Sequence, residues 1–311
     1  MYQLSVPSKT FLVGEYVALQ GGPALVLNTE PRFQLMVTDR VPGTSTFHTQ
    51  HTDLRRTENP YIQRILADNF FDSYDFGFQD PFYGRGGLGA SSAQLVMLLG
   101  FKAWKLTGQW EISEILSCLR QFDGYRGSGY DAISQLTGGV SHIESGCEHY
   151  KATEWPWLDY EPILIRGPKK TVTHEHLAEL KEKNLVTLHN ISRETIKSYI
   201  DKNLEGFAKG ISDFSEEQSR LGLLSSETQT AIETFKADSM VKVARGCGAL
   251  GSDTLMLIVN RRRNPRWDLQ LKEKHEVLPT LISRGLRVAQ TRMMTGRPTV
   301  GLANLLMGLD R

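Results

Sequence analysis

Apolar and polar residues alternate along the first forty positions in the manner of β-strands. Gly14 and the run Gly21-Gly22-Pro23 interrupt this pattern and are typical of turns. The apolar or β-branched stretches between them are residues 3–6, 9–13, 24–27 and 33–37. We therefore predict that the chain opens with a β-meander. After a polar stretch, apolar residues return at helical spacing between Tyr61 and Phe71, which predicts a helix.

A glycine-rich stretch, residues 83–93, precedes the apolar run 95–99. Four of the six positions from Gly84 to Gly89 are glycine, and Ser91 and Ser92 follow. Glycine lets the backbone approach a ligand, and the start of a helix offers free N–H donors and a partial positive charge. The stretch therefore predicts an anion site, with phosphate as the guest, at the start of a buried helix that runs to about Leu106.

Two phosphate-binding patterns fit this stretch, and each lacks a part. Gly84-x-Gly86-x-x-Gly89 matches the dinucleotide fingerprint, but residues 78–82 are a poor central strand and no second strand is evident behind the helix. The same glycines followed by Ala90 read as a P-loop in which alanine replaces the required lysine. The positive charge of such a site must come from elsewhere in the chain. A glycine-rich helix start without a ligand is the remaining alternative.

The rest of the chain mixes helices and strands without regular βα alternation. The expected helices are residues 111–122, a short helix ending at 137–139, residues 173–180, one or two helices in 193–221, one from Ser226, and residues 268–284. The expected strands are residues 140–143, 163–165, 241–244, 254–259 and 286–289. Glycine turns at 84–89, 127–129 and 246–251 could serve one site. Segregated helices and antiparallel strands favour an α+β fold, with residues 147–160 as the passage into a second domain.

Composition indicates a soluble globular protein that is long enough for two domains. The 311 residues are 40% hydrophobic and 23% charged with a net charge of +1, so no field of one sign argues for a nucleic acid or an anionic membrane as partner. No signal sequence opens the chain and no apolar run has membrane-spanning length, so we expect a cytoplasmic protein. Cys118, Cys147 and Cys247 lack CxxC spacing and are expected to be free thiols. Monomer and homodimer both remain open.

Three further signals are assigned to ordinary structure. Residues 261–266 are rich in arginine, but the Asn-Pro step among them favours a solvated turn. His174 and His176 lack the i, i+4 spacing of a helical zinc pair. Trp155 and Trp157 are expected to pack at the junction between the domains.

Four elements, in order along the chain, resemble the motifs of the GHMP small-molecule kinases, a family that includes galactokinase, homoserine kinase, mevalonate kinase and phosphomevalonate kinase. The matching segments are Pro7-Ser8-Lys9-Thr10-Phe11-Leu12-Val13-Gly14-Glu15-Tyr16 with Gly21-Gly22-Pro23-Ala24-Leu25, then Gly87-Leu88-Gly89-Ala90-Ser91-Ser92-Ala93, Gly127-Ser128-Gly129-Tyr130-Asp131 and Gly246-Cys247-Gly248-Ala249-Leu250-Gly251. Tyr16 stands where mevalonate kinase usually has histidine, so the first motif is more similar to that of phosphomevalonate kinase.

The resemblance implies a two-domain α+β fold. A ribosomal-protein-S5-like domain with the phosphate loop would span residues 1–155, and a ferredoxin-like domain would span residues 156–311. It also implies a kinase that transfers the γ-phosphate of ATP, with Mg²⁺ in the cleft between the domains, to a hydroxyl or phosphate of a small metabolite. Mevalonate and phosphomevalonate, intermediates of isoprenoid biosynthesis, are the best candidates for this acceptor.

The resemblance also implies roles for individual residues. Asp131 would orient and deprotonate the acceptor hydroxyl, and Lys9 would supply the positive charge that Ala90 does not. The residues expected at ATP are Gly84, Arg85, Gly86, Gly87, Leu88, Gly89, Ala90, Ser91 and Ser92, with the Ser91 hydroxyl also reaching magnesium. The residues expected near the acceptor are Glu15, Tyr16, Ser128, Gly129, Tyr130, Gly248 and Ala249. Helix capping is the alternative role for Asp131, Ser91 and Ser92.

Departures from the family pattern keep other functions open. Arg120 stands near the position of the magnesium-binding glutamate of mevalonate kinase, with Asp123 as the nearest carboxylate. Ala249 and Leu250 replace glycines of the third motif, and the segment that would bind adenine is not identified. The alternatives are a non-catalytic nucleotide-binding regulator with the same fold and an enzyme like diphosphomevalonate decarboxylase.

Overall fold

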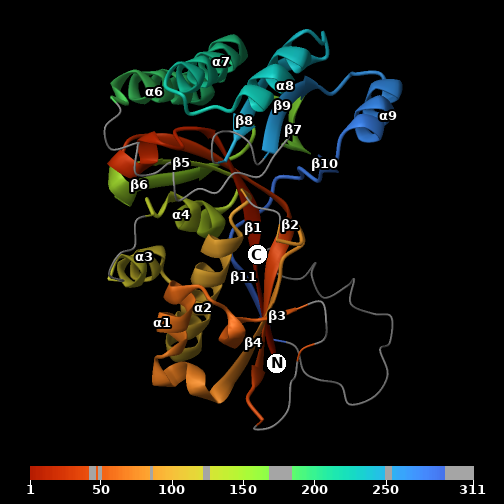
Figure 1. Ribbon diagram of the computed structural model, residues 1–311. Coiled ribbons are helices and arrows are strands. Elements are labelled where there is room, and N and C mark those ends of the chain that lie inside the picture. Colours follow the sequence, from red (N-terminus) through yellow and green to blue (C-terminus); the bar gives the residue numbers. More distant parts are fainter. Residues whose placement is uncertain are drawn as a thin grey trace.

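Two antiparallel sheets form the framework of the molecule in the computed structural model, which describes residues 1–41, 47, 51–84, 87–121, 127–167, 184–248 and 254–290. In Figure 1 the sheet of the N-terminal half lies below, with its helices to one side, and the second sheet lies above it under a layer of helices. None of the helices in this part of the chain is long and apolar enough to cross a membrane.

The first sheet is organised around the long antiparallel pair β1 (Tyr2–Val13) and β2 (Ala24–Asp39). From Val6 to Val13 every β1 residue except Lys9 is buried, and most of β2 is buried, as expected for a pair that is covered on both faces over much of its length. The other strands are β3 (Thr52–Asp53), β4 (Tyr74–Gln79), β5 (Val140–Glu144), β6 (His149–Thr153) and β11 (Arg287–Gln290). The order is β11-β1-β2-β4-β3. In addition, β5 pairs with Ala24 to Leu27 at the start of β2, and β6 pairs with β5.

Four α-helices cover one face of this sheet, and they position the glycine-rich stretch and Asp131 (Figure 1). They are α1 (Pro60–Leu66), α2 (Ala90–Thr107), α3 (Ile112–Arg120) and α4 (Tyr130–Thr137). Short 3₁₀ turns join the elements: η1 (Val17–Gln20), η2 (Leu54–Arg56), η3 (Asn69–Ser73) and η4 (Ser145–Cys147). Helix α2 carries a continuous apolar run, Leu95 to Leu99, and this run is buried in the core beside the sheet, as expected for a helix that is apolar on all sides.

The second sheet has the strand order β10-β7-β9-β8. Its strands are β7 (Tyr160–Arg166), β8 (Val241–Cys247), β9 (Thr254–Asn260) and β10 (Val277–Leu278), and its helices are α6 (Val186–Ile200), α7 (Leu204–Arg220), α8 (Ser226–Lys236) and α9 (Pro265–Lys274). Met256 and Ile258 of β9 belong to the same buried cluster as the core of the first sheet. One face of the second sheet therefore shares the core of the first sheet, whereas Ile165, Leu255 and Leu257 on its other face belong to a separate cluster.

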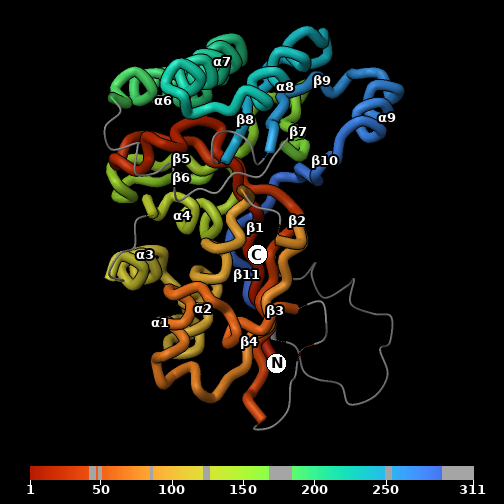
Figure 2. Tube along the Cα trace, viewed as in Figure 1, coloured from red at the N-terminus to blue at the C-terminus, as the bar shows by residue number. Residues whose placement is uncertain are grey.

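The last described strand returns to the first sheet. Figure 2 traces the chain from β10 down to β11, which pairs with β1 from Tyr2↔Gln290 to Ser5↔Arg287. Arg32 of β2 fixes the approach to this strand, because its guanidinium donates to Ser283 Oγ at 2.6 Å, Arg284 O at 2.6 Å and Ser5 O at 2.7 Å. The N-terminal sheet is therefore completed by residues from the far end of the described chain.

The structure confirms most of the expected elements and corrects several of them. Antiparallel strands with segregated helices are confirmed, and none of the three cysteines forms a disulfide among the described residues. The helix expected over residues 268–284 is confirmed as far as Lys274, where α9 ends, and is wrong beyond it, because β10 follows. The interpretation of residues 78–82 as a poor strand is also wrong in part, because Phe78 and Gln79 end β4, which is antiparallel to its neighbours. The helix expected at 173–180, with His174 and His176, lies outside the described residues.

Candidate active site

Lys9 and Asp131 form an ion pair, and the other predicted site residues are described relative to it. Lys9 Nζ lies 3.1 Å from Asp131 Oδ2, with the lysine side chain 11% exposed and the aspartate 37% exposed. The lysine ammonium also lies 5.1 Å from the centre of the Phe11 ring, within range of a cation–π contact. Asp131 is the second residue of α4, where the free N–H groups of the helix start favour a negative charge. Strand β1 and helix α4 therefore hold a matched pair of charges at a partly open position.

The end of the glycine-rich stretch lies directly against this pair. Lys9 N donates to Leu88 O at 3.0 Å, and the Gln135 amide donates to Pro7 O at 3.0 Å and Gly89 O at 3.1 Å. Gly89 has φ +94°, and a Cβ there would lie 2.9 Å from both Lys9 Cγ and Gln135 Nε2. A residue with a side chain would not fit at this position, so the glycine is required for the loop to approach β1.

The start of α2 has free hydrogen-bonding capacity. Gly89 is its N-cap and no side chain caps the helix within the part of the chain that the structure describes, which leaves N–H donors of the first turn for a ligand. Ser91 is exposed, and Asn59 Nδ2 lies 3.5 Å from its hydroxyl. Ser92 Oγ is buried and makes no hydrogen bond among the described residues. These features suit the binding of an anion such as phosphate.

Other predicted ATP contacts lie along the same loop. Gly84 N donates to Asp80 Oδ2 at 2.8 Å, so the aspartate closes the turn that begins the loop. Gly87 has φ +89°, a conformation that favours glycine, and Leu88 is buried. Arg85 and Gly86 lie outside the described residues. Their contact with ATP stays a prediction.

The residues predicted near the acceptor differ in their burial and in their contacts within the protein. Ser128 Oγ accepts a hydrogen bond from Tyr130 N at 3.2 Å, and Gly129 packs on Cys147. Tyr130 is fully buried, its hydroxyl donates to Gly22 O at 2.9 Å, and burial raises its pKa to about 12. The tyrosine hydroxyl therefore stays protonated at neutral pH and anchors α4 to the turn before β2.

Glu15 and Tyr16 of the first motif are committed to contacts inside the protein. The Glu15 carboxylate pairs with Arg245 of β8 and accepts a hydrogen bond from Gly248 N at 3.1 Å. Tyr16 is 8% exposed, and its hydroxyl lies 3.4 Å from Leu223 O. The start of the third glycine turn is thus joined to the first motif, whereas Ala249 lies outside the described residues.

The oxygen donors at this site fit a magnesium ion held chiefly by nucleotide phosphates. Mg²⁺ usually binds through one or two protein oxygens together with substrate phosphates and water. The exposed Ser91 hydroxyl is an oxygen donor of this kind, whereas the Asp131 carboxylate is paired with Lys9. No group of three or more His, Cys, Asp or Glu side chains suited to a metal occurs among the residues that the structure describes. Arg120 instead donates to Gly146 O, and Asp123 lies outside the described chain.

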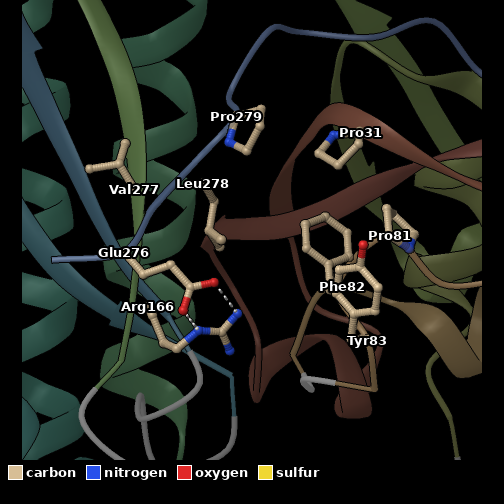
Figure 3. A pocket seen from close by; sticks show the side chains of 9 residues that line it. All are labelled: Pro31, Pro81, Phe82, Tyr83, Arg166, Glu276, Val277, Leu278 and Pro279. Carbon is tan, nitrogen blue, oxygen red and sulfur yellow. Dashed lines mark hydrogen bonds and ion pairs between the residues drawn. The ribbon is translucent and has the colours of Figure 1, made fainter. Parts of the chain in front are cut away.

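A cavity of about 340 Å³ opens between the two sheets near the beginning of the glycine-rich loop (Figure 3). Phe82, Pro31 and Leu278 form its apolar walls. Arg166 and Glu276 on its opposite side make a bidentate pair at 2.7 and 3.2 Å, and each satisfies the charge of the other. Tyr83 is 87% exposed at its edge.

The signals discounted in the sequence analysis are structural in the described residues. Trp157 stacks on Phe207 with 4.7 Å between ring centres and contacts Trp155, so both tryptophans pack at the junction of the sheets. Arg261 and Arg262 are 50% and 82% exposed, which confirms the interpretation of this basic run as a solvated turn, whereas Arg263 is largely buried and pairs with Glu161 and Asp268.

Sequence reasoning missed Gln135 and Arg245. Gln135 lies four residues after Asp131 on the same helix, so the i, i+4 spacing would have indicated that both side chains lie on one face. Arg245 follows an apolar strand segment, and a charged residue within a buried strand was the available signal.

The fold defined by these two sheets is that of small-molecule kinases. No family model and no curated protein sequence matches the chain. Galactokinase of Lactococcus lactis, solved in complex with galactose, superposes with a TM-score of 0.71 at 12% identity, over 92% of this chain and 94% of that one. Phosphomevalonate kinase of Streptococcus pneumoniae, in complex with phosphomevalonate and AMPPNP, gives 0.67 at 14% identity, over 91% and 100%.

Mevalonate kinase of Methanococcus jannaschii is also similar, with a TM-score of 0.60 at 13% identity, covering 94% of this chain and 98% of the other. These are members of the group that the four sequence motifs resemble. The resemblance to the GHMP kinases is therefore confirmed at the level of the fold.

Proposed function

We propose that this protein is an ATP-dependent kinase that phosphorylates a hydroxyl or phosphate group of a small metabolite, with mevalonate or phosphomevalonate as the best candidate acceptor. The observation that carries the proposal is the Lys9–Asp131 pair, 3.1 Å apart, beside the open start of α2. Phosphoryl transfer requires the positioning of the acceptor and the neutralisation of charge, and this pair with the glycine loop supplies both.

Each residue has a defined part in the transfer. The start of α2 and the glycine loop bind the phosphates of ATP through backbone N–H groups. Asp131 accepts the proton of the acceptor hydroxyl as its oxygen bonds to the γ-phosphorus, while the bond from that phosphorus to the β,γ-bridging oxygen breaks and ADP leaves. Lys9 holds the Asp131 carboxylate in place and offsets negative charge on the transferred group. Magnesium, when bound at Ser91, would neutralise the phosphate oxygens further.

We further propose that the two sheets correspond to an S5-like and a ferredoxin-like domain, and that the protein acts in the cytoplasm. The second sheet supports the ferredoxin-like assignment. Its strands in chain order are β7, β8, β9 and β10, and the order β10-β7-β9-β8 places the fourth of them beside the first and the third beside the second. The chain order of helices and strands around it is that expected of a ferredoxin-like unit. Monomer and homodimer are both compatible with the proposal.

The test is ADP formation by the purified protein with ATP and magnesium, against a panel of mevalonate, phosphomevalonate, diphosphomevalonate, homoserine and sugars. We expect acceptor-dependent ADP release that falls by about 10²–10⁴-fold in Asp131→Asn, because the variant lacks the general base. Release of carbon dioxide would identify a decarboxylase. Nucleotide binding without turnover on any acceptor would contradict the proposal and favour a regulatory protein.

A further inference from the structure

Arg245 is a fully buried cation between the two sheets. Its side chain is 0% exposed, and its guanidinium carbon lies 5.0 Å from the centre of the Phe214 ring. Its donors reach four acceptors: Leu12 O, Gly246 O, Gln218 Oε1 and the Glu15 carboxylate. Burial has the largest single effect and lowers the pKa of Arg245, but Glu15 together with Cys247 and Tyr16 outweighs it, so the net pKa is raised. Such a buried charge is stable only while its partner is present.

Glu15 connects this cation to the third glycine turn. One carboxylate oxygen binds Arg245, and the other accepts the hydrogen bond from Gly248 N at 3.1 Å. The Gln218 amide bridges Arg245 and Glu15. Its Oε1 accepts a hydrogen bond from Arg245, and its Nε2 lies 3.3 Å from Glu15 Oε2. Both Glu15 oxygens are therefore engaged within the protein, and the carboxylate ties the end of β8 to the turn after β1.

The same turn also contacts the strand that carries Lys9. Cys247 Sγ lies 3.6 Å from Phe11 O, and the Phe11 ring contacts the Lys9 ammonium. The segment from Gly246 to Gly248 is thus held at Phe11 in β1 and at Glu15 in the turn after β1, on either side of Leu12 and Val13. A shift of this segment would therefore reach Lys9 through one residue, Phe11.

We propose that Glu15 and Arg245 are a positioning pair that sets the Gly246–Gly248 turn against β1 and so fixes Lys9 and Asp131 for phosphoryl transfer. This inference rests on the proposed kinase function. It assigns Glu15 to the contact between the two sheets, rather than to the acceptor or to magnesium. The pair acts through other residues and does not touch the reacting atoms.

Four variants test the pair. Glu15→Gln and Arg245→Gln each leave one buried charge without its partner, and the double variant Glu15→Gln/Arg245→Gln removes both charges. Arg263→Gln is the matched control, because Arg263 is also largely buried, at 11% exposure, and paired with two carboxylates. Both of its partners belong to the second sheet and its helices, so this pair does not join the two sheets. Circular dichroism and thermal unfolding establish that each variant is folded before it is assayed.

We expect each single substitution to lower kcat by about 10- to 100-fold, with the KM for ATP changed less than about threefold, because a displaced turn misplaces the reacting groups and leaves the phosphate loop intact. The double variant is expected to recover about tenfold over Arg245→Gln, since no charge is then buried alone. Arg263→Gln should lower the unfolding temperature and leave kcat unchanged. A double variant no more active than the worse single variant would show that Glu15 acts directly on substrate or metal, and would overturn the inference.

Hydrogen exchange gives a second readout that requires no turnover. We expect the amides of Gly246 to Gly248 to exchange at least about tenfold faster in Arg245→Gln than in the wild type or in Arg263→Gln, because Glu15 then no longer holds Gly248 N. Unchanged exchange would overturn the pair whatever the activity. Faster exchange in a protein that turns over no acceptor would leave the contact established and contradict only the kinase proposal.

Discussion

Lys9 combines two contacts that a surface lysine does not make together, an ion pair to Asp131 and a position over the Phe11 ring. Both contacts restrain the long side chain, so little rotamer freedom is left to lose when a substrate binds. The ammonium is also held near the end of the glycine loop, because its own backbone N–H donates to Leu88 O. At the scale of the residue, Lys9 therefore connects the proposed phosphate site to the proposed base.

Substitution of Lys9 tests this connection. We expect Lys9→Ala to lower kcat by about 10²-fold or more while the Kd for ATP rises by less than about tenfold, because the lysine acts mainly on the charge that develops during transfer. Steady-state kinetics and equilibrium ATP binding measure the two effects separately. Equal losses in both would place Lys9 in ground-state binding instead.

Gly89 is the second residue whose identity is fixed by its surroundings. We expect Gly89→Ala to destabilise the protein by about 2–4 kcal/mol, because the new Cβ would be strained at φ +94° and would press on Lys9 and Gln135. Gly108→Ala is the control, since Gly108 has φ +78° but open space around it, and should cost only about 1–2 kcal/mol. Urea unfolding of both variants provides the comparison, and equal losses would contradict the crowding at Gly89.

Among the elements, β5 joins the α4 region to β2, and it carries a partly buried histidine. Burial lowers the pKa of His142, although Glu144 at 3.9 Å acts in the opposite direction. Between this lowered pKa and the ordinary value of 6.5, the unfolded chain binds a proton that the folded chain does not. The contribution of His142 to stability is therefore complete above pH 6.5 and is lost as the pH falls below that value.

We expect the free energy of unfolding to decrease as the pH is lowered from about 6.5, and we expect His142→Gln to reduce that slope. His189 and His275 contribute in the same direction, because burial lowers their pKa values too, so the slope will not vanish. Denaturant unfolding at a series of pH values measures the effect. A slope that is unchanged in His142→Gln would show that the β5 histidine is protonated alike in both states.

Elements with strong local signals were predictable from the sequence. The helix after the glycine stretch was expected to about Leu106 and ends at Thr107, since apolar periodicity and Gly108 define it. The split of β1 into two strands was wrong, because Pro7 is accommodated beside an irregularity in the pairing with β2. β6 was missed, because its exposed residues carry no apolar pattern and its position is set by pairing with β5.

The candidate site shows the same division between local and long-range information. Lys9, Gly89 and Asp131 were found because motif spacing marks them, and the structure brings them together. Their supporting contacts were not predictable, because Gln135 reaches Pro7 across 128 residues of sequence and Arg245 reaches Glu15 across 230. Such contacts depend on how the sheets pack, which no local pattern encodes.

At the scale of the whole molecule, the two sheets are joined twice, by their shared core and by the return of the chain to β1. Arg32 strengthens the second connection, since burial lowers its pKa only to about 10 and it remains charged at neutral pH beside its carbonyl acceptors. Strands β1 to β6 lie in the first sheet and β7 to β10 in the second, but β11, the last described strand, returns to the first sheet.

A fragment of residues 1–155 tests the importance of this return. We expect it to aggregate at concentrations where the full chain stays dispersed, because the Tyr2–Ser5 edge of β1 would be open to pairing and Arg32 would lose three acceptors. Light scattering measures the aggregation. A synthetic peptide of residues 281–290 should suppress it by restoring the missing strand, and a soluble fragment without the peptide would contradict the prediction.

The pairing of β11 with β1 also bears on how the protein is made. Tyr2 is synthesised almost three hundred codons before its partner Gln290. Throughout translation the nascent polypeptide therefore carries an uncapped strand, the form of intermediate that molecular chaperones protect. The native sheet can therefore close only after β11 has been synthesised, and not when the N-terminal half is complete.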